Sequence, residues 1–198
     1  MFDVVSLVKT FGYFGIFGIV FAESGLMVGF FFPGDSLLFT AGVLASANFL
    51  NIWILTPLIF LAAVLGDNIG YFLGREAGEK LFERESSFFF RRSHAVKAKE
   101  FFSEHGSSAV VLARFVPVMR TFVPVIAGIG RMEYKKFFFF DLIGGLLWGV
   151  GLTLIGFFLG NIIPDVDRYL LPIVGVIVTV SLLPVIKVWY SAWKQTKR

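Results

Sequence analysis

Long apolar stretches separated by short polar breaks run through most of the 198-residue chain. Residues 54–74, 137–160 and 169–190 are each long enough and apolar enough to cross a bilayer as a helix. Two further apolar stretches, 13–50 and 106–130, contain prolines and charged residues part-way along. Because proline removes a backbone donor and a charge is costly in lipid, these two stretches predict bent, re-entrant segments rather than straight spans.

The second broken segment carries two arginines, Arg114 and Arg120, and two prolines, Pro117 and Pro124. An arginine at the centre of a bilayer costs about 3 kcal/mol on insertion scales, which argues against a straight helix facing lipid. On one continuous helix the two arginines would lie on different faces. A break at Pro117 would allow both guanidinium groups to point into one cavity.

The first broken segment places two acids, Glu23 and Asp35, on either side of Pro33. Low dielectric favours the neutral acid and a neighbouring guanidinium favours the carboxylate, so these acids are candidates for reversible proton binding. The alternative is a permanently charged pair that only neutralises Arg114 and Arg120.

The two halves of the chain resemble each other. The sequence IGYFLG at 69–74 matches IGFFLG at 155–160, and Ala-Gly at 41–42 matches Ala-Gly at 127–128 with the same offset. Upstream, Glu23 corresponds to Arg114. The pattern predicts an all-α membrane protein built as an inverted repeat, in which each unit is a re-entrant helical hairpin plus a transmembrane helix. An extra C-terminal transmembrane helix follows.

The expected organisation is a single membrane domain over 1–198. Its parts are an interfacial helix (1–12), repeat 1 (13–74), a polar connector (75–105), repeat 2 (106–160) and the C-terminal transmembrane helix (169–190). Lysine and arginine concentrate in the connector, in the turn at 131–136 and in the C-terminal tail. The positive-inside rule therefore predicts that the connector and the C-terminus are cytoplasmic.

Composition agrees with a membrane protein, because hydrophobic residues make up 57%, charged residues only 16%, and mean hydropathy is +0.80. The net charge of +4 indicates cytoplasmic loops and anionic lipid rather than nucleic acid. No cysteine is present, and His94 and His105 are scattered, so neither a metal site nor a cofactor is predicted. The first residues lack the basic region of a cleaved signal peptide.

Four segments together resemble the DedA family: 21–42, 66–75, 101–128 and 137–149. The arginine motif R-F-x-P-x-x-R-T-x-x-P-x-x-A-G is complete over 114–128. The DedA family consists of small bacterial inner-membrane proteins within the wider VTT, or SNARE-associated Golgi protein, group. The resemblance implies two facing re-entrant loops and transport of lipid carriers, particularly undecaprenyl phosphate. Some members are linked to proton-dependent drug and alkaline tolerance, and eukaryotic relatives scramble phospholipids.

The family's functional residues fall here on Glu23, Asp35, Arg114 and Arg120. The expected function is a transporter or flippase that moves a lipid phosphate, undecaprenyl phosphate or a phospholipid, across the bacterial inner membrane with proton coupling. Arg114 and Arg120 would bind the phosphate, and Glu23 and Asp35 would bind protons. The lesser candidates are Asp67, Pro33, Pro117 and Pro124.

Several residues receive a structural interpretation. Asp67 and Asp141 lie near the ends of apolar stretches and are expected to be satisfied at the interface. Arg75 and Arg131 are expected to mark the cytoplasmic interface, and Trp148 to face lipid or the core.

Three other function classes are weaker. A proton-coupled exporter of drugs or ions would favour an anionic cavity, whereas the repeat pairs acid with base. A membrane enzyme would need a nucleophile, and no histidine or cysteine lies in the apolar stretches, so no enzymatic activity is expected. A scaffold would have no use for four costly charges. The sequence leaves open the lipid, the ion stoichiometry, the direction of transport, the side of the N-terminal helix and a homo-oligomeric assembly.

Overall fold

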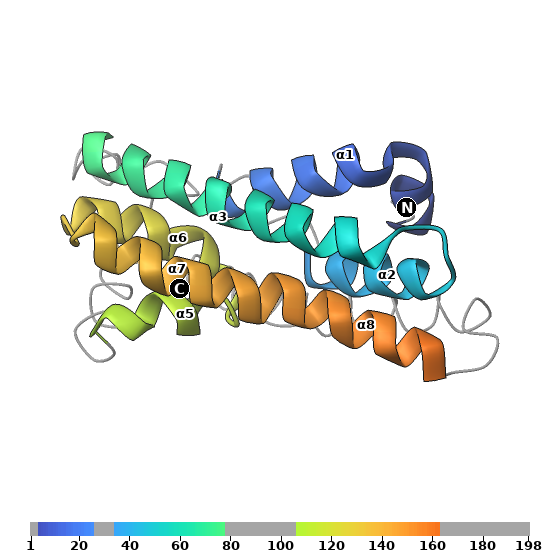
Figure 1. The fold of residues 1–198 in the computed structure, drawn as a ribbon. Helices are drawn as coiled ribbons and strands as arrows, with labels where there is room; N and C mark the ends of the chain where they lie inside the picture. The colour runs from blue at the N-terminus through green and yellow to red at the C-terminus, as the bar shows by residue number, and fades with distance from the viewer. Residues whose placement is uncertain (1–3, 26–33, 78–105, 163–198) are drawn as a thin grey trace, which may run out of the picture.

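The computed structural model describes residues 4–25, 34–77 and 106–162, and this part of the chain is all helix and turn. Two long helical rods run side by side along the whole length of the molecule (Figure 1). The first is α3 (Ile52–Ala77), and the second joins α7 (Tyr134–Gly145), the π-helical turn η4 (Leu146–Val150) and α8 (Gly151–Ile162). Their apolar segments, Ile52–Glu76 and Tyr134–Ile162, are 25 and 29 residues long, enough to cross a bilayer.

Helices α1 (Val4–Gly25) and α2 (Gly34–Ser46) occupy one half of this length. Helix α1 changes direction at Gly12, where φ is 54° and ψ is −141°. After this kink α1 lies beside the α2–α3 turn, where the Asn51 N–H donates a hydrogen bond to the Tyr13 hydroxyl, and it ends against Gly66 of α3. Helix α2 returns along α8, and a Cβ added at Gly42 would overlap the α8 backbone. The C-terminal end of α1 and the N-terminal end of α2 therefore lie near the middle of the molecule.

The other half of the length holds the turn η3 (Gly106–Ser108), the short helix α5 (Ala109–Ala113) and α6 (Pro117–Ile129). Pro117 is the first residue of α6. The N–H at this position has no partner within the helix, so proline costs no hydrogen bond there. From there α6 runs along the C-terminal half of α3, where Gly74 and Gly128 bring the two backbones together. Residues 114–116 form the break between α5 and α6 that the sequence predicts.

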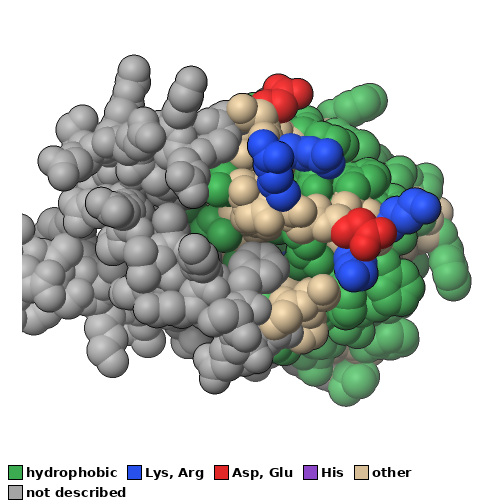
Figure 2. All heavy atoms as spheres, turned by 90° about the vertical axis from the view of Figure 1, so that its left-hand side faces the viewer, with side chains coloured by type: hydrophobic (Ala, Val, Ile, Leu, Met, Phe, Trp, Pro, Cys, Tyr) green, Lys and Arg blue, Asp and Glu red, His purple; other side chains and the backbone are tan. Residues whose placement is uncertain are grey.

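The exposed charged side chains gather at one end of the described part of the chain (Figure 2). They come from the end of α3 and from the turn into α7: Arg75, Glu76, Arg131, Glu133, Lys135 and Lys136. At the opposite end, the described residues 46–53 and 160–162 carry no charge. Large apolar side chains such as Leu65 and Leu147 are exposed along the two long rods. This distribution matches a helical protein whose sides face lipid.

The predicted all-α class is confirmed for the described residues, and the predicted spans 54–74 and 137–160 are helical. Arg75 and Arg131 lie exposed at the charged end, as expected of interfacial residues. Pro33, most of the 75–105 connector and the predicted C-terminal helix at 169–190 lie outside the described residues. Of the interfacial segment 1–12, only the helical backbone from residue 4 onward is described.

Candidate functional site

Arg120 lies between two carboxylates that come from two other helices. It belongs to the first turn of α6, Glu23 to the last turn of α1 and Asp35 to the first turn of α2. The Arg120 guanidinium donates one hydrogen bond to Glu23 Oε1 and a second, of 2.5 Å, to Asp35 Oδ1. We call Glu23, Asp35 and Arg120, together with Trp148 described below, the Arg120 cluster.

Trp148 completes the Arg120 cluster from the second long rod. It lies in the π-helical turn η4, halfway along Tyr134–Ile162. Its indole Nε1–H donates a 2.8 Å hydrogen bond to Asp35 Oδ1, and the Arg120 guanidinium carbon lies 4.9 Å from the centre of the ring. A cation at this distance from an indole face is attracted by the ring quadrupole. Because π-helical turns often occur at functional sites, η4 is an additional reason to place Trp148 in the site.

Glycine at position 34 makes room for the Arg120 cluster. A Cβ at Gly34 would overlap the carboxylate of Glu23, so the backbone of α2 approaches that side chain directly. Asp35 also lies in the first turn of α2, where the positive end of the helix dipole attracts negative charge. Glu23 is at the negative end of α1 and receives no such help.

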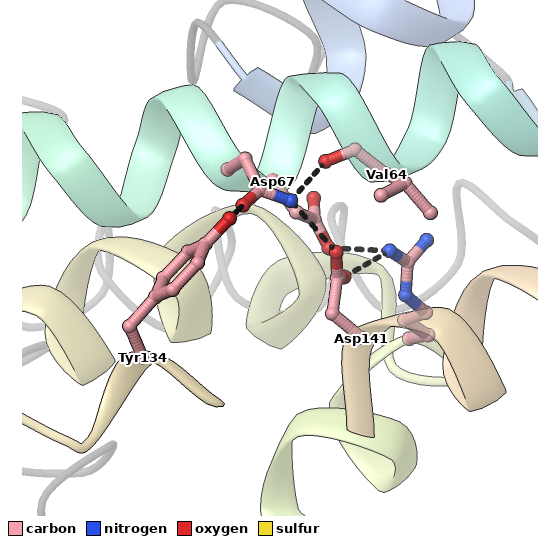
Figure 3. Close-up of polar contacts among 6 residues, drawn as sticks. Val64, Asp67, Tyr134 and Asp141 are labelled. Atoms are coloured by element: carbon pink, nitrogen blue, oxygen red, sulfur yellow. Dashed lines mark hydrogen bonds and ion pairs between the residues drawn. The ribbon is translucent and has the colours of Figure 1, made fainter. Parts of the chain in front are cut away.

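Arg114, the C-cap residue of α5, lies in a second cluster. Its Nη2 atom is 2.7 Å from Asp67 Oδ2 of α3 and 2.5 Å from Asp141 Oδ1 of α7. The Asn68 amide donates a 3.2 Å hydrogen bond to the other oxygen of Asp141 and accepts one of 2.8 Å from the Tyr134 hydroxyl (Figure 3). We call these five residues the Arg114 cluster.

The two clusters differ in their access to the surface. In the Arg114 cluster the side chains of Arg114, Asp67 and Asp141 are 3%, 4% and 0% exposed. In the Arg120 cluster Glu23 is equally buried, but Asp35 is 24% exposed and Arg120 is 11% exposed. The side chains of Arg120 and Asp35 are therefore partly exposed at the surface, whereas the guanidinium of Arg114 is enclosed by its partners.

The structure changes three expectations from the sequence. Only Arg120 joins Glu23 and Asp35, because the break before α6 sends Arg114 toward α7. Asp67 and Asp141 are not interfacial; they are buried partners of Arg114. Each arginine contacts two acids, whereas the repeat suggested one acid for each base and no excess of negative charge.

Two residues of the clusters, Asp141 and Trp148, received only a structural interpretation from the sequence. Asp141 interrupts an otherwise apolar stretch, and the cost of burying a carboxylate there was a usable signal. Trp148 gave no comparable signal. A tryptophan needs a polar neighbour only when its N–H is buried, and the sequence does not show whether it is buried. Of the lesser candidates, Pro124 is buried in α6 and faces Gly70 of α3, so it packs against a helix instead of contacting the charged groups.

Comparison of the sequence with known proteins identifies the family of this chain. Residues 32–162, which include both arginines, match the VTT domain. Protein DedA of Escherichia coli is 48% identical over 171 residues, which cover 85% of this chain and 78% of the relative. The chain belongs to the DedA family of VTT-domain membrane proteins.

Two further relatives of this DedA-family protein are named as membrane proteins. An uncharacterized membrane protein of Mycobacterium leprae is 46% identical over 180 residues, 90% of this chain and 80% of the relative. The inner membrane protein YqjA of E. coli is 36% identical over 149 residues, 75% of this chain and 68% of the relative. No solved structure matches the chain.

Proposed function

We propose that this DedA-family protein is a transporter or flippase that moves a lipid phosphate, undecaprenyl phosphate or a phospholipid, across the bacterial inner membrane with proton coupling. The observation that carries the proposal is the position of Arg120. Its guanidinium is held by exchangeable carboxylate partners at the middle of the molecule, with access to the surface beside Asp35. Phosphate oxygens accept the same paired N–H donors as a carboxylate does, and they can replace one.

The proposed architecture is an inverted repeat of two re-entrant hairpins, and matching glycine contacts support it. Gly42 lies against the backbone of Thr153 and Phe157 in α8, and the corresponding residue Gly128 lies against the backbone of Tyr71 and Arg75 in α3. Tyr71 corresponds to Phe157, so the two contacts share one matching residue. Transporters with inverted repeats and broken helices bind substrate near the middle of the membrane, where the Arg120 cluster lies in this proposal. The charged end of Figure 2 is then the cytoplasmic end.

Charge balance makes proton coupling a consequence of phosphate binding. One guanidinium already faces the two acids Glu23 and Asp35. A phosphate added beside two ionised carboxylates is repelled by each, by about 4 kcal/mol per pair at 4 Å and an effective dielectric of 20. Phosphate therefore binds Arg120 when at least one acid takes up a proton. Glu23 is the better candidate, because Asp35 keeps the indole N–H and the helix dipole in its favour.

The experiment is a flipping assay with the purified full-length chain in liposomes. Undecaprenyl phosphate and a phospholipid are compared with a neutral diacylglycerol, with and without a pH gradient. We expect faster movement of a phosphate lipid than of the neutral lipid, and a further change in rate when the gradient is imposed. Equal rates for all three lipids, or rates that ignore the gradient, would overturn the corresponding half of the proposal.

A proton-coupled exporter of drugs or ions is the second candidate, and the structure gives it one argument that the sequence did not. Each cluster contains two acids for one arginine, so the two clusters together carry excess negative charge when every group is ionised. A cation could neutralise that excess. The lipid proposal is preferred because Arg120, the most accessible cation of the two clusters, would repel a cationic cargo. Uptake of a cationic dye by the same liposomes separates the two.

Replacing Trp148 with phenylalanine should slow phosphate-lipid transport by about tenfold to a hundredfold. The substitution keeps an aromatic ring beside Arg120 and removes only the N–H that holds Asp35. A hydrogen bond to a charged group contributes about 1.5–3 kcal/mol, which corresponds to that loss. The matched control is Trp53→Phe, an exposed tryptophan at the start of α3. Equal rates for Trp148→Phe and the control would remove Trp148 from the site.

A further inference from the structure

The Arg114 cluster contains more acid than base, and it is closed. Both carboxylates, Asp67 Oδ2 and Asp141 Oδ1, contact the same nitrogen of Arg114, and neither side chain is more than 4% exposed. With all three groups ionised the cluster would carry one net negative charge. Burying an uncompensated charge costs several kcal/mol even after the surroundings relax. One additional positive charge, which could be as small as a proton, removes that cost.

The two acids are held differently. Asp141 accepts hydrogen bonds at both oxygens, from Arg114 at one and from Asn68 at the other. The Asn68 side chain is itself fixed by the Val64 carbonyl, 2.7 Å from its amide nitrogen, and by the Tyr134 hydroxyl (Figure 3). This arrangement suits a carboxylate, which only accepts.

Asp67 has a poorer set of partners. Among the described residues its carboxyl group contacts one cation, Arg114, through the same nitrogen that contacts Asp141. Two ionised carboxylates both accept and cannot bond to each other, so crowding them onto one nitrogen is favourable only when one of them carries a proton. Two carboxyl groups that share a site commonly hold a single proton between them.

We propose that the Asp67–Asp141 pair is a second proton-binding site, separate from the Arg120 cluster, with Asp67 as the residue that carries the proton. Its O–H donates to Asp141, which stays ionised beside Arg114. The other groups that face Asp67 are Arg120 from α6 and the Tyr134 hydroxyl of α7, which reaches the pair through Asn68. An amide does not relay protons, so Tyr134 and Asn68 position Asp141 and are not a conduction path. The inference rests on this geometry and not on the identity of the lipid.

Infrared spectroscopy of the purified full-length chain in lipid nanodiscs at neutral pH tests the proposal without any transport. We expect a C=O stretch of a protonated carboxylic acid that shifts when aspartate is labelled with ¹³C. The band should persist in Asp35→Asn and Glu23→Gln, which leave the Arg114 cluster intact. It should disappear in Asp67→Asn and in Asp141→Asn, because either change leaves one acid for one guanidinium.

Stability then assigns the proton within the pair. Asp67→Asn replaces a neutral acid by a neutral group of the same shape, so its melting temperature should fall less than that of Asp141→Asn. The reverse order would overturn the assignment to Asp67. Absence of a label-sensitive band in the wild-type chain and in Asp35→Asn would overturn the site itself, and this measurement does not require that the Asp67 variant folds. A transport failure would leave the infrared result unchanged, so the two proposals fail separately.

Discussion

Replacing Arg120 with alanine should reduce transport of a phosphate lipid at least a hundredfold. Arg120 is the accessible cation of the site, and its two guanidinium nitrogens make separate hydrogen bonds to Glu23 and Asp35. Hydrogen bonds to charged groups contribute about 1.5–3 kcal/mol each, so losing two such contacts to a phosphate corresponds to a factor of a hundred or more. Flipping rates in liposomes measure the loss.

A matched set of variants separates substrate binding from simple charge neutralisation. Arg120→Ala leaves Glu23 buried without its cation, which could by itself unfold the site. The neutral triple variant Arg120→Gln, Glu23→Gln, Asp35→Asn removes that penalty, and we expect it to fold and to remain inactive. Arg75→Ala, which removes an exposed arginine at the charged end, should transport normally. Transport by the neutral triple variant would show that Arg120 only balances the acids.

Arg120→Lys refines the same prediction. Lysine keeps the positive charge and loses the planar fork whose two ends reach two different helices. We therefore expect normal folding with transport reduced about tenfold or more. Full activity in Arg120→Lys would indicate that a point charge is sufficient and that paired recognition of phosphate is not required.

The sequence predicted the helices well because membrane segments follow simple physical rules. Length and apolarity identified both described spans, and proline at position 117 identified the break before α6. The internal similarity includes Gly42 and Gly128, and in the structure each lies against the backbone of a facing helix. These features are local, or they repeat along the chain, so one sequence is sufficient to find them.

The partners of the charged residues were harder to predict because they depend on how helices are arranged in space. Arg114 and Arg120 are close in the sequence, yet the turn between α5 and α6 directs them to different helices. Asp67 lies near the C-terminal end of a predicted span, but α5 and α6 pack over this part of α3 and bury it. Sequence position relative to a span end is therefore a poor guide to burial where a broken segment covers that end.

Replacing Arg114 with methionine should destabilise the protein by about 3–5 kcal/mol, the cost typical of breaking a buried ion pair. Asp67 and Asp141 would lose their shared cation in a place that water does not reach. For a chain of this length that loss corresponds to a fall of about 10 °C in melting temperature, measured in detergent. Arg75→Met, at an exposed arginine, is the control and should melt close to the wild type.

Removing the acids as well should reverse the effect. In the triple variant Arg114→Met, Asp67→Asn, Asp141→Asn no ionised group is buried in the cluster, and apolar replacements of similar volume often match or exceed a buried ion pair in stability. We expect its melting temperature to recover, together with a substantial part of transport, since Arg120 and its partners are untouched. Neutralising the Arg120 cluster should restore folding without restoring transport. This contrast would assign substrate binding to Arg120, and to Arg114 the role of holding α3, α5 and α7 together. A stable but inactive Arg114 triple variant would instead place both arginines in the transport step.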